Sequence, residues 1–285
     1  MDIDDILASV DRHDPTTPES TALDHQLLTR FWVAERGVSE LLPWPGPLME
    51  RMMERVRRQI ETIEDLAAST PDSIPPPPPT TTITTTTTTG TKSNTTLNLT
   101  LSILQTDLSR TQYLLRSLLR QRLSKLTKHS MHYLMRISSP HDQSQSQSQS
   151  QSQNPDGEIR PEDSIPVPLA GDDAAIAPLS APEVSFLVAH QRLLARHYGD
   201  AFLGSFAPQL RRLDDNAGGT SMVQGPEMRE VVFVRCLVEE VRVVVPPSDG
   251  VEEETVGTAM RMGDVWAVRW EGVRGAWTRG EVEIL

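Results

Sequence analysis

Residues 97–137 contain neither proline nor glycine, and this uninterrupted stretch constrains the fold more than any other feature of the chain. Its apolar residues recur at steps of three and four, the period of one face of an α-helix. The spacing predicts a single helix over residues 97–137, ended by Ser138, Ser139 and Pro140. The residues on the predicted face are Ile103, Leu104, Leu108, Leu115, Leu118, Leu119, Leu123, Leu126, Tyr133, Leu134 and Ile137.

This helix is too long for the domain that the chain can build around it. At about 1.5 Å per residue, its length is roughly 60 Å. The helical segments sum to about 126 residues, and a compact body of that size is about 36 Å across. We therefore expect a leucine-rich face that another chain covers. The alternative is a long amphipathic helix inside a larger single-chain bundle.

Charge is unevenly distributed along the chain. The net charge of −12 argues against a general nucleic-acid coat. Residues 97–137 are the exception, because they carry seven basic residues and a single acid, Asp107. Two interpretations remain open: a solvated face, or a surface for phosphates or an acidic partner. The basic residues are Arg110, Arg116, Arg120, Arg122, Lys125, Lys128 and Arg136.

Cysteine usage and hydropathy limit the class of protein. The single cysteine, Cys236, excludes a disulfide framework within the chain and a multi-cysteine zinc site. It indicates a reducing compartment. No apolar run approaches the roughly 18 residues of a membrane span. The N-terminus is acidic, which is not typical of a secretory or transit signal.

Three further helices are predicted around the long one. Residues 21–37 end at Gly37, residues 48–68 follow an apolar turn at 41–47, and a third helix begins after Ser180. Ser180 and Glu183 have the spacing of a capping box. A shorter helix is expected over residues 200–213.

Low-complexity segments separate these helices. Residues 71–96 contain five consecutive prolines and a threonine tract, and residues 138–179 contain a Gln-Ser alternation. The first composition cannot bury a core, so residues 71–96 are predicted to be a disordered loop. The Gln-Ser alternation at 143–153 is the same kind of insertion, and the wider segment 138–179 is predicted to be a linker.

After Met228 the apolar period changes to two, which predicts strands. Val232 and Val234 share a face with Cys236, which is therefore expected in a core. Further strands are predicted at 258–262, 265–270, 273–278 and 281–285. They are separated by turns at Gly263-Asp264, Glu271-Gly272 and Arg279-Gly280.

The predicted fold is mainly α. An N-terminal antiparallel helical bundle domain with one very long helix is followed by a small C-terminal β-strand domain. The predicted divisions are an acidic tail at 1–19, a helical domain at 20–213 that includes both low-complexity segments, a linker at 214–230, and a β domain at 231–285.

The sequence offers little for catalysis. It has no phosphate-binding loop, no dinucleotide fingerprint and no nucleophile elbow. His129 and His132 have a spacing that permits a shared metal, but the segment is basic and no further ligand lies nearby. We expect no enzyme activity, no metal and no cofactor.

The N-terminus has the pattern of a short partner-binding peptide. Ile3, Ile6, Leu7 and Val10 share a helical face among aspartates, and prolines separate this segment from the body. A helix this short is marginal alone in water. The pattern favours a peptide that folds in another protein's groove. A frayed terminus is the alternative.

Several blocks resemble the Sld five subunit family of the eukaryotic GINS replication complex, and they occur in the family's order. One block is Ile-Leu-Gln-Thr-Asp-Leu-Ser-Arg at 103–110, and another is Glu-Leu-Leu-Pro-Trp-Pro at 40–45. The others are at 29–36, 114–117, 120–123, 128–129, 210–215, 262–264, 268–270 and 280–285.

The resemblance implies a nuclear, four-chain assembly with the Psf one, Psf two and Psf three subunits. That assembly joins the MCM hexamer and the Cdc forty-five factor in the replicative helicase. The resemblance also implies that Asp4, Asp5, Ile6 and Leu7 bind a trimeric replisome hub of the Ctf-four type.

The hypothesis is a non-catalytic scaffold subunit needed for initiation and elongation of DNA replication. Two alternatives stay open. One is a nucleic-acid-binding protein that uses Arg116, Arg120 and Arg122, and the other is a metal-dependent hydrolase that uses His129 and His132. The residues expected to act as structural or interface anchors are Trp32, Trp44, Leu115, Leu118 and Trp270.

Overall fold

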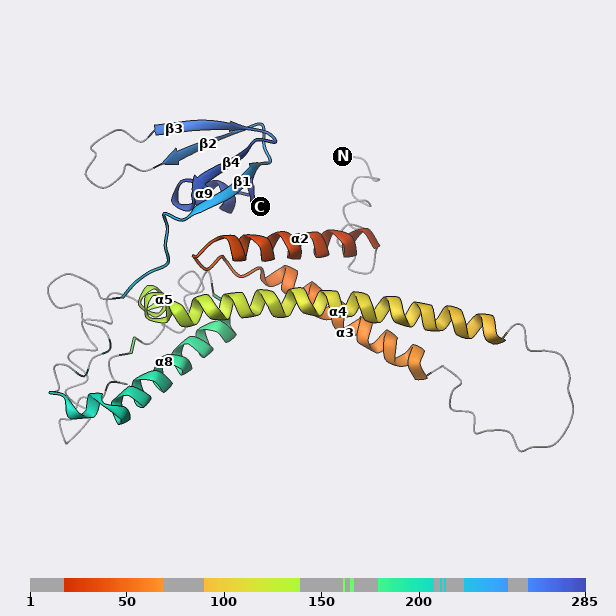
Figure 1. Ribbon diagram of the computed structural model, residues 1–285, viewed down its shortest axis with the longest axis horizontal. Coiled ribbons are helices and arrows are strands. Elements are labelled where there is room, and N and C mark those ends of the chain that lie inside the picture. The colour runs from red at the N-terminus through yellow and green to blue at the C-terminus, as the bar shows by residue number, and fades with distance from the viewer. Residues whose placement is uncertain are drawn as a thin grey trace, which may run out of the picture. The chain divides into compact units, whose positions relative to one another are not determined.

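The computed structural model describes residues 18–68, 90–138, 161, 165–166, 179–207, 211, 213, 223–245 and 256–285 (Figure 1). The predicted N-terminal peptide and most of both low-complexity segments lie outside these residues. The chain divides into two compact units. Unit 1 consists of Met1–Trp32 and Pro45–Leu118, and unit 2 of Val33–Trp44 and Leu119–Leu285. Two helices, α2 and α4, contribute to both units.

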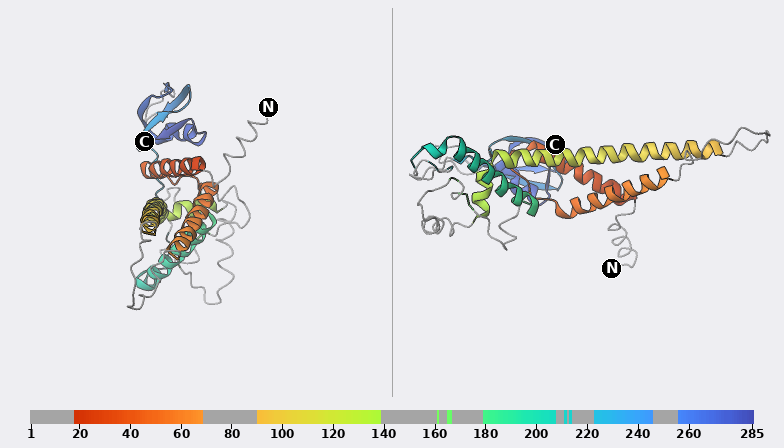
Figure 2. Two further views of the ribbon diagram at one scale, coloured as in Figure 1. Left: turned by 90° about the vertical axis from the view of Figure 1, so that its right-hand side faces the viewer. Right: turned by 90° about the horizontal axis from the view of Figure 1, so that it is seen from below.

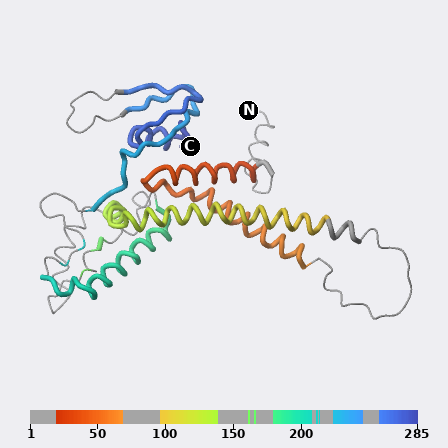
Figure 3. Tube along the Cα trace, in the orientation of Figure 1, coloured from red at the N-terminus to blue at the C-terminus, as the bar shows by residue number. Residues whose placement is uncertain are grey.

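The mainly helical fold with a small C-terminal strand region is confirmed. The helices are α2 (Pro18–Gly37), α3 (Gly46–Ala68), α4 (Gly90–Lys128), α5 (Ser130–Ile137), α8 (Ala181–Ala201) and α9 (Trp270–Thr278), with a 3-10 turn η3 (Leu203–Ser205). The strands are β1 (Val231–Cys236), β2 (Glu240–Val245), β3 (Val256–Arg261), β4 (Val265–Arg269) and β5 (Val282–Ile284). Figure 3 follows the same trace from α2 to β5.

Unit 1 is built from α2, α3 and α4, which polar contacts join in pairs. Asp24 on α2 accepts hydrogen bonds from Arg51 and Arg55 on α3 at 2.9–3.3 Å. Gln59 on α3 donates to the Leu104 carbonyl of α4 at 3.0 Å. The buried apolar residues that these contacts flank are Leu28, Met49, Met52, Val56, Leu115 and Leu118. The views in Figure 2 show α3 running beside α4 at an angle.

The long helix differs from its prediction at both ends. Helix α4 begins at Gly90, inside the segment predicted to be disordered, and ends at Lys128. His129 has φ −115° and ψ 32° and separates α4 from α5. Since the local sequence contains no helix breaker, tertiary contacts explain the break. Gln191 on α8 donates a hydrogen bond to Ser130, and His129 contacts the Gln224 carbonyl.

The prediction of a single apolar face on this helix was also wrong. Leu118 and Leu126 are buried, whereas Ile103, Leu119 and Leu123 are 59%, 45% and 43% exposed. A helix turns about 100° per residue, so Leu119 and Leu123 lie about 100° and about 140° from Leu118 around the helix axis. Over more than ten turns, mixed steps of three and four residues therefore distribute the apolar side chains over more than one face of the helix.

The core of unit 2 packs α5 and α8 against the end of α4. Its buried members include Leu126, Tyr133, Leu134 and Leu187. Ile165 and Leu179, which the prediction placed in a linker, are buried in the same cluster. The predicted helix over 200–213 is absent from its described residues, because α8 ends at Ala201 and only the short turn η3 follows.

The C-terminal region contains two small antiparallel sheets, ordered β4-β1-β5 and β2-β3. Val232, Val234 and Cys236 of β1 are buried, as the alternation predicts. Gly263 and Gly280 have φ of +86° and +75°, and both lie in turns predicted at these positions.

The strand predicted over 273–278 is wrong, because these residues form the end of helix α9. Trp270, Val273 and Ala276 are buried at three-residue steps, a helical period that the neighbouring glycines obscure. Gly272 has a packing role instead of a turn role. A Cβ there would lie 2.8 Å from the Val244 carbonyl oxygen, so glycine lets α9 approach β2 closely.

Candidate functional site

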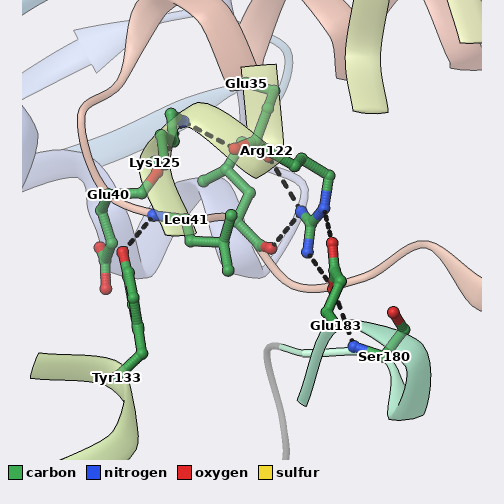
Figure 4. Close-up of polar contacts among 9 residues, drawn as sticks. Glu35, Glu40, Leu41, Arg122, Lys125, Tyr133, Ser180 and Glu183 are labelled. Atoms are coloured by element: carbon green, nitrogen blue, oxygen red, sulfur yellow. Dashed lines mark hydrogen bonds and ion pairs between the residues drawn. The ribbon is translucent and has the colours of Figure 1, made fainter. Parts of the chain in front are cut away.

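Three charged side chains meet in the interior of unit 2 (Figure 4). Glu35 comes from the last turns of α2, and Arg122 and Lys125 come from α4. Their exposed fractions are 0%, 1% and 6%, so all three charges are removed from water. Buried charges are tolerated only when paired and hydrogen-bonded, so this cluster fixes the relative positions of the elements that supply it.

All three nitrogen atoms of the Arg122 guanidinium donate hydrogen bonds. Its Nη1 donates to Glu35 Oε2 at 3.1 Å and to the Leu42 carbonyl at 2.8 Å. Its Nε and Nη2 donate to the two carboxylate oxygens of Glu183 at 2.7 and 3.0 Å. The guanidinium also stacks 5.1 Å from the ring centroid of Trp44. This planar, bidentate arrangement suits arginine and not lysine.

Lys125 completes the cluster. Its Nζ donates to Glu35 Oε1 at 2.7 Å and to the Glu40 carbonyl at 2.8 Å. Burial lowers the pKa of Lys125 below its ordinary value, and the Glu35 carboxylate opposes this shift. Glu35 therefore keeps this ammonium charged in an environment that favours its neutral form.

Glu183 has two roles. Besides binding Arg122, its Oε2 accepts a hydrogen bond from the Ser180 backbone N–H at 2.9 Å. The predicted capping box at the start of α8 is thus confirmed. Since one carboxylate caps α8 and pairs with α4, the first turn of α8 is tied to the buried cluster.

Glu40 connects the segment after α2 to the C-terminal region. Its Oε2 accepts the indole N–H of Trp270 at 2.8 Å, and its Oε1 accepts Arg274 Nη2 at 2.7 Å. Arg136 of α5 lies 3.6 Å from the same Oε1. Glu40 is 5% exposed, so it is a buried joint between α5, α9 and the segment after α2.

Tyr133 supports this joint from α5. Its hydroxyl accepts the backbone N–H of Leu41 at 2.9 Å, which satisfies an otherwise buried donor. Burial raises the pKa of Tyr133 to about 12, so the phenol stays neutral at physiological pH.

The five predicted anchors occupy different environments. In unit 1, Leu115 and Leu118 are 6% and 0% exposed, and the half-buried Trp32 donates its indole N–H to Ser117 Oγ at 2.9 Å. In unit 2, Trp270 is buried against Glu40, and the half-buried Trp44 stacks on Arg122. Asp4, Asp5, Ile6 and Leu7 lie outside the described residues.

Comparison with known proteins identifies the family. The model described as "GINS complex protein helical bundle domain" matches residues 52–202, more than half of the chain. The model described as "DNA replication complex GINS protein SLD5 C-terminus" matches residues 226–285. The chain belongs to the SLD5 family of GINS proteins. Its role is therefore that of a GINS subunit in DNA replication.

Curated relatives agree with this SLD5 assignment. A protein of Chaetomium globosum named "DNA replication complex GINS protein SLD5" is 30% identical over all of both chains. The protein of the same name from Yarrowia lipolytica is 31% identical over 88% of this chain and 75% of its own. A Schizosaccharomyces pombe relative is 27% identical over 84% of this chain and 79% of its own.

The basic residues of this SLD5-family chain do not form one surface. Arg122 and Lys125 are buried in ion pairs, whereas Arg116 and Arg120 are exposed. The nucleic-acid alternative counted Arg122 as a surface residue, and that assignment is wrong. Two of the seven basic residues in the long helical stretch therefore form ion pairs within the chain and do not contribute to its surface.

The two histidines contact the segment before the β strands. His129 Nδ1 lies 3.1 Å from the Gln224 carbonyl, and the His132 ring packs on Gly225. Burial, followed by nearby Arg136, lowers the pKa of His132. Among the described residues, no group of three potential ligands surrounds a metal position. No described helix is long and apolar enough to cross a membrane.

Sequence reasoning missed the three glutamates that organise the cluster. Glu40 lies between Val38 and Leu41, and Glu35 follows Ala34, so both acids have apolar neighbours in the sequence, which is a usable signal for buried pairing. Their partners are over eighty residues away in sequence, so no local pattern identifies them. Glu183 was assigned to a cap, but its second partner was not predicted.

Proposed function

We propose that this SLD5-family chain is a non-catalytic structural subunit of a GINS heterotetramer with the Psf one, Psf two and Psf three subunits. In this proposal the tetramer acts in the nucleus with the MCM hexamer and the Cdc forty-five factor. It serves as part of the replicative helicase during initiation and elongation. Residues 20–213 form the tetramer-building helical domain and residues 231–285 a docking domain, with 1–19 and 214–230 as tail and linker.

The uncovered N-terminal half of α4 supports this proposal. Of the described residues 96–110, none is buried by its own chain. Leu99, Ile103 and Tyr113 are 61%, 59% and 63% exposed. They lie within about 80° of arc on one helix face. Contiguous exposed apolar side chains of this kind mark protein interaction surfaces.

A hollow beside Tyr113 adds to this surface. The open pocket there has a volume of about 500 Å³ and is lined by side chains of α2 and α4. Its wall includes His25, Thr29, Arg110 and Leu114. It offers space for side chains of a partner helix, as expected of a helix-packing interface.

Co-expression with the three candidate partner subunits tests the proposal. Ile103→Asp places a charge in the proposed interface, whereas Gln105→Asp introduces the same residue on a different face. Burial of an isoleucine contributes about 1.5–3 kcal/mol. We expect Ile103→Asp to weaken assembly by at least about 2 kcal/mol, roughly 30-fold.

The assay is the mass and dissociation of the purified complex, followed by analytical ultracentrifugation. Gln105→Asp is expected to assemble like the unmodified chain. A stable, monomeric chain with no exposed apolar surface contradicts the proposal, as does an Ile103→Asp complex of normal affinity.

We further propose that Asp4, Asp5, Ile6 and Leu7 bind a trimeric replisome hub of the Ctf-four type. The apolar pair would enter a groove and the aspartates would meet its basic rim. Replacing Ile6 and Leu7 by Ala should abolish hub binding and leave the tetramer intact, while Ser9→Ala should change neither. Loss of both properties would instead indicate that the terminus belongs to the core.

A further inference from the structure

A second pocket lies in unit 2, where the 40–43 segment meets helix α9. Its volume is about 460 Å³. Buried Leu41, Leu42 and Trp270 contribute its inner wall. Trp277 packs edge-on against Trp270, with 5.9 Å between ring centroids, and also lines the pocket. The inner part of the pocket is therefore apolar and aromatic.

The rim of this pocket is basic. Arg136, Arg274 and Arg279 line it, and Glu40 is the one carboxylate among the lining residues that the structure describes. Glu40 is already committed to Trp270 and Arg274. Arg279 pairs with Glu281, which lies outside the lining. Even with Glu281 included, three guanidinium charges face two carboxylates.

The three arginines retain donors for a ligand. Arg136, Arg274 and Arg279 have side chains that are 46%, 44% and 61% exposed. Each guanidinium carries five N–H donors. Arg274 uses Nη2 toward Glu40, and Arg136 lies too far from Glu40, at 3.6 Å, for a hydrogen bond. Carboxylates of a ligand therefore find charged donors at this rim.

We propose that this pocket binds an acidic segment of a partner protein, with an apolar side chain in the aromatic interior and flanking Asp or Glu residues on the arginine rim. The partner is a protein that associates with the already assembled GINS complex. The proposal adds a binding site to the structural role proposed above.

The pocket's charge and size favour a peptide over nucleic acid. A nucleic-acid strand needs a continuous positive track along its phosphates. Here Glu40 lies among the basic lining residues and Glu281 pairs with Arg279 beside them, so the positive charge is not continuous. A confined pocket with an apolar interior fits one or two side chains of a peptide better than a backbone of phosphates.

The test uses the assembled complex and a fluorescein-labelled ten-residue probe that alternates Asp or Glu with Phe or Leu. A matched probe has Asn and Gln in place of the acids. Arg279→Gln removes one rim charge outside the buried network. Arg196→Gln is the control, because Arg196 is 73% exposed, pairs with Asp200 and does not line the pocket.

Fluorescence polarisation should show the acidic probe binding at least about tenfold more tightly than the amide probe. Arg279→Gln should weaken that binding at least about fivefold, and Arg196→Gln by less than about twofold. Three results overturn the proposal: no binding of the acidic probe, equal losses in both variants, or displacement of the probe by an oligothymidine strand in an Arg279-dependent manner.

Discussion

Replacing Glu35 by Gln tests whether the buried cluster holds α2 and α4 together. Glu35 is fully buried and pairs with Arg122 at 3.1 Å and with Lys125 at 2.7 Å. Glutamine keeps the shape of the side chain and one acceptor oxygen. It removes the negative charge, so Arg122 keeps Glu183 as its carboxylate partner, whereas Lys125 loses the carboxylate that it contacts directly.

The size of the effect follows from this imbalance. Removing one partner of a buried ion pair destabilises by about 3–5 kcal/mol, because an uncompensated charge stays in the interior. Arg122 keeps its bidentate contact with Glu183, which limits its own loss. Lys125 keeps one neutral acceptor, the Glu40 carbonyl. We therefore expect a loss near the lower end, about 3 kcal/mol at pH 7.

The loss should depend on pH through Lys125. Burial already lowers the pKa of this lysine, and Glu35 raises it. Without Glu35 the pKa falls further below its ordinary value of 10.5. At pH values between the folded and the unfolded pKa of Lys125, the unfolded chain binds more protons than the folded chain. The free energy of unfolding therefore rises with pH in this range. This rise begins at lower pH in the variant and amounts to at most about 1.4 kcal/mol per pH unit.

Hydrogen exchange resolved by mass spectrometry measures this effect within the assembled complex, with rates corrected for intrinsic pH dependence. Peptides that cover residues 33–37 and 119–128 should exchange about a hundredfold faster in Glu35→Gln at pH 7. The control is Glu54→Gln, which removes an exposed partner of Arg58 at 2.9 Å and should cost less than about 0.5 kcal/mol. Equal effects of the two substitutions would refute the structural role of the cluster.

Two further predictions concern the joint and α5. Trp270→Phe keeps the aromatic bulk but leaves Glu40 without its indole donor, so protection of α9 should fall by about 1–3 kcal/mol in the same experiment; unchanged protection would show that the hydrogen bond is dispensable. Burial lowers the pKa of His132 below 6.5, so α5 should be fully stable above about pH 6.5 and lose protection as the pH falls. His132→Gln should remove this pH dependence, and a persistent dependence would assign it to another group.

Much of the fold was predictable because the periodic pattern is local. The stop at Gly37, the cap at Ser180 and the alternation in β1 all depend on neighbouring residues. The break at His129 was not predictable, because it depends on contacts with Gln191 and Gln224 far along the chain. Helix α9 was missed because its glycines resemble turn signals, although Gly272 is in fact required for close packing on β2.

The candidate site was harder to predict from the sequence than the fold. Periodicity marks which face is apolar, so it placed Leu115 and Leu118 on that face as structural or interface anchors, and both are buried within the chain. It treats every charged residue as solvent-facing and so assigned Arg122 and Lys125 to the surface. Their burial depends on Glu35, which packs against them only after the helices meet. Long-range electrostatic pairing has no signature in one sequence.

Glu40 has a consequence for dividing the protein into fragments. It lies outside both ranges that match the family models, 52–202 and 226–285. A fragment of residues 226–285 would separate Trp270 and Arg274 from the carboxylate that both of them bind. The excised C-terminal piece would then expose its largest buried side chain. A peptide spanning residues 33–44, added in trans, would restore the Glu40 carboxylate to this fragment.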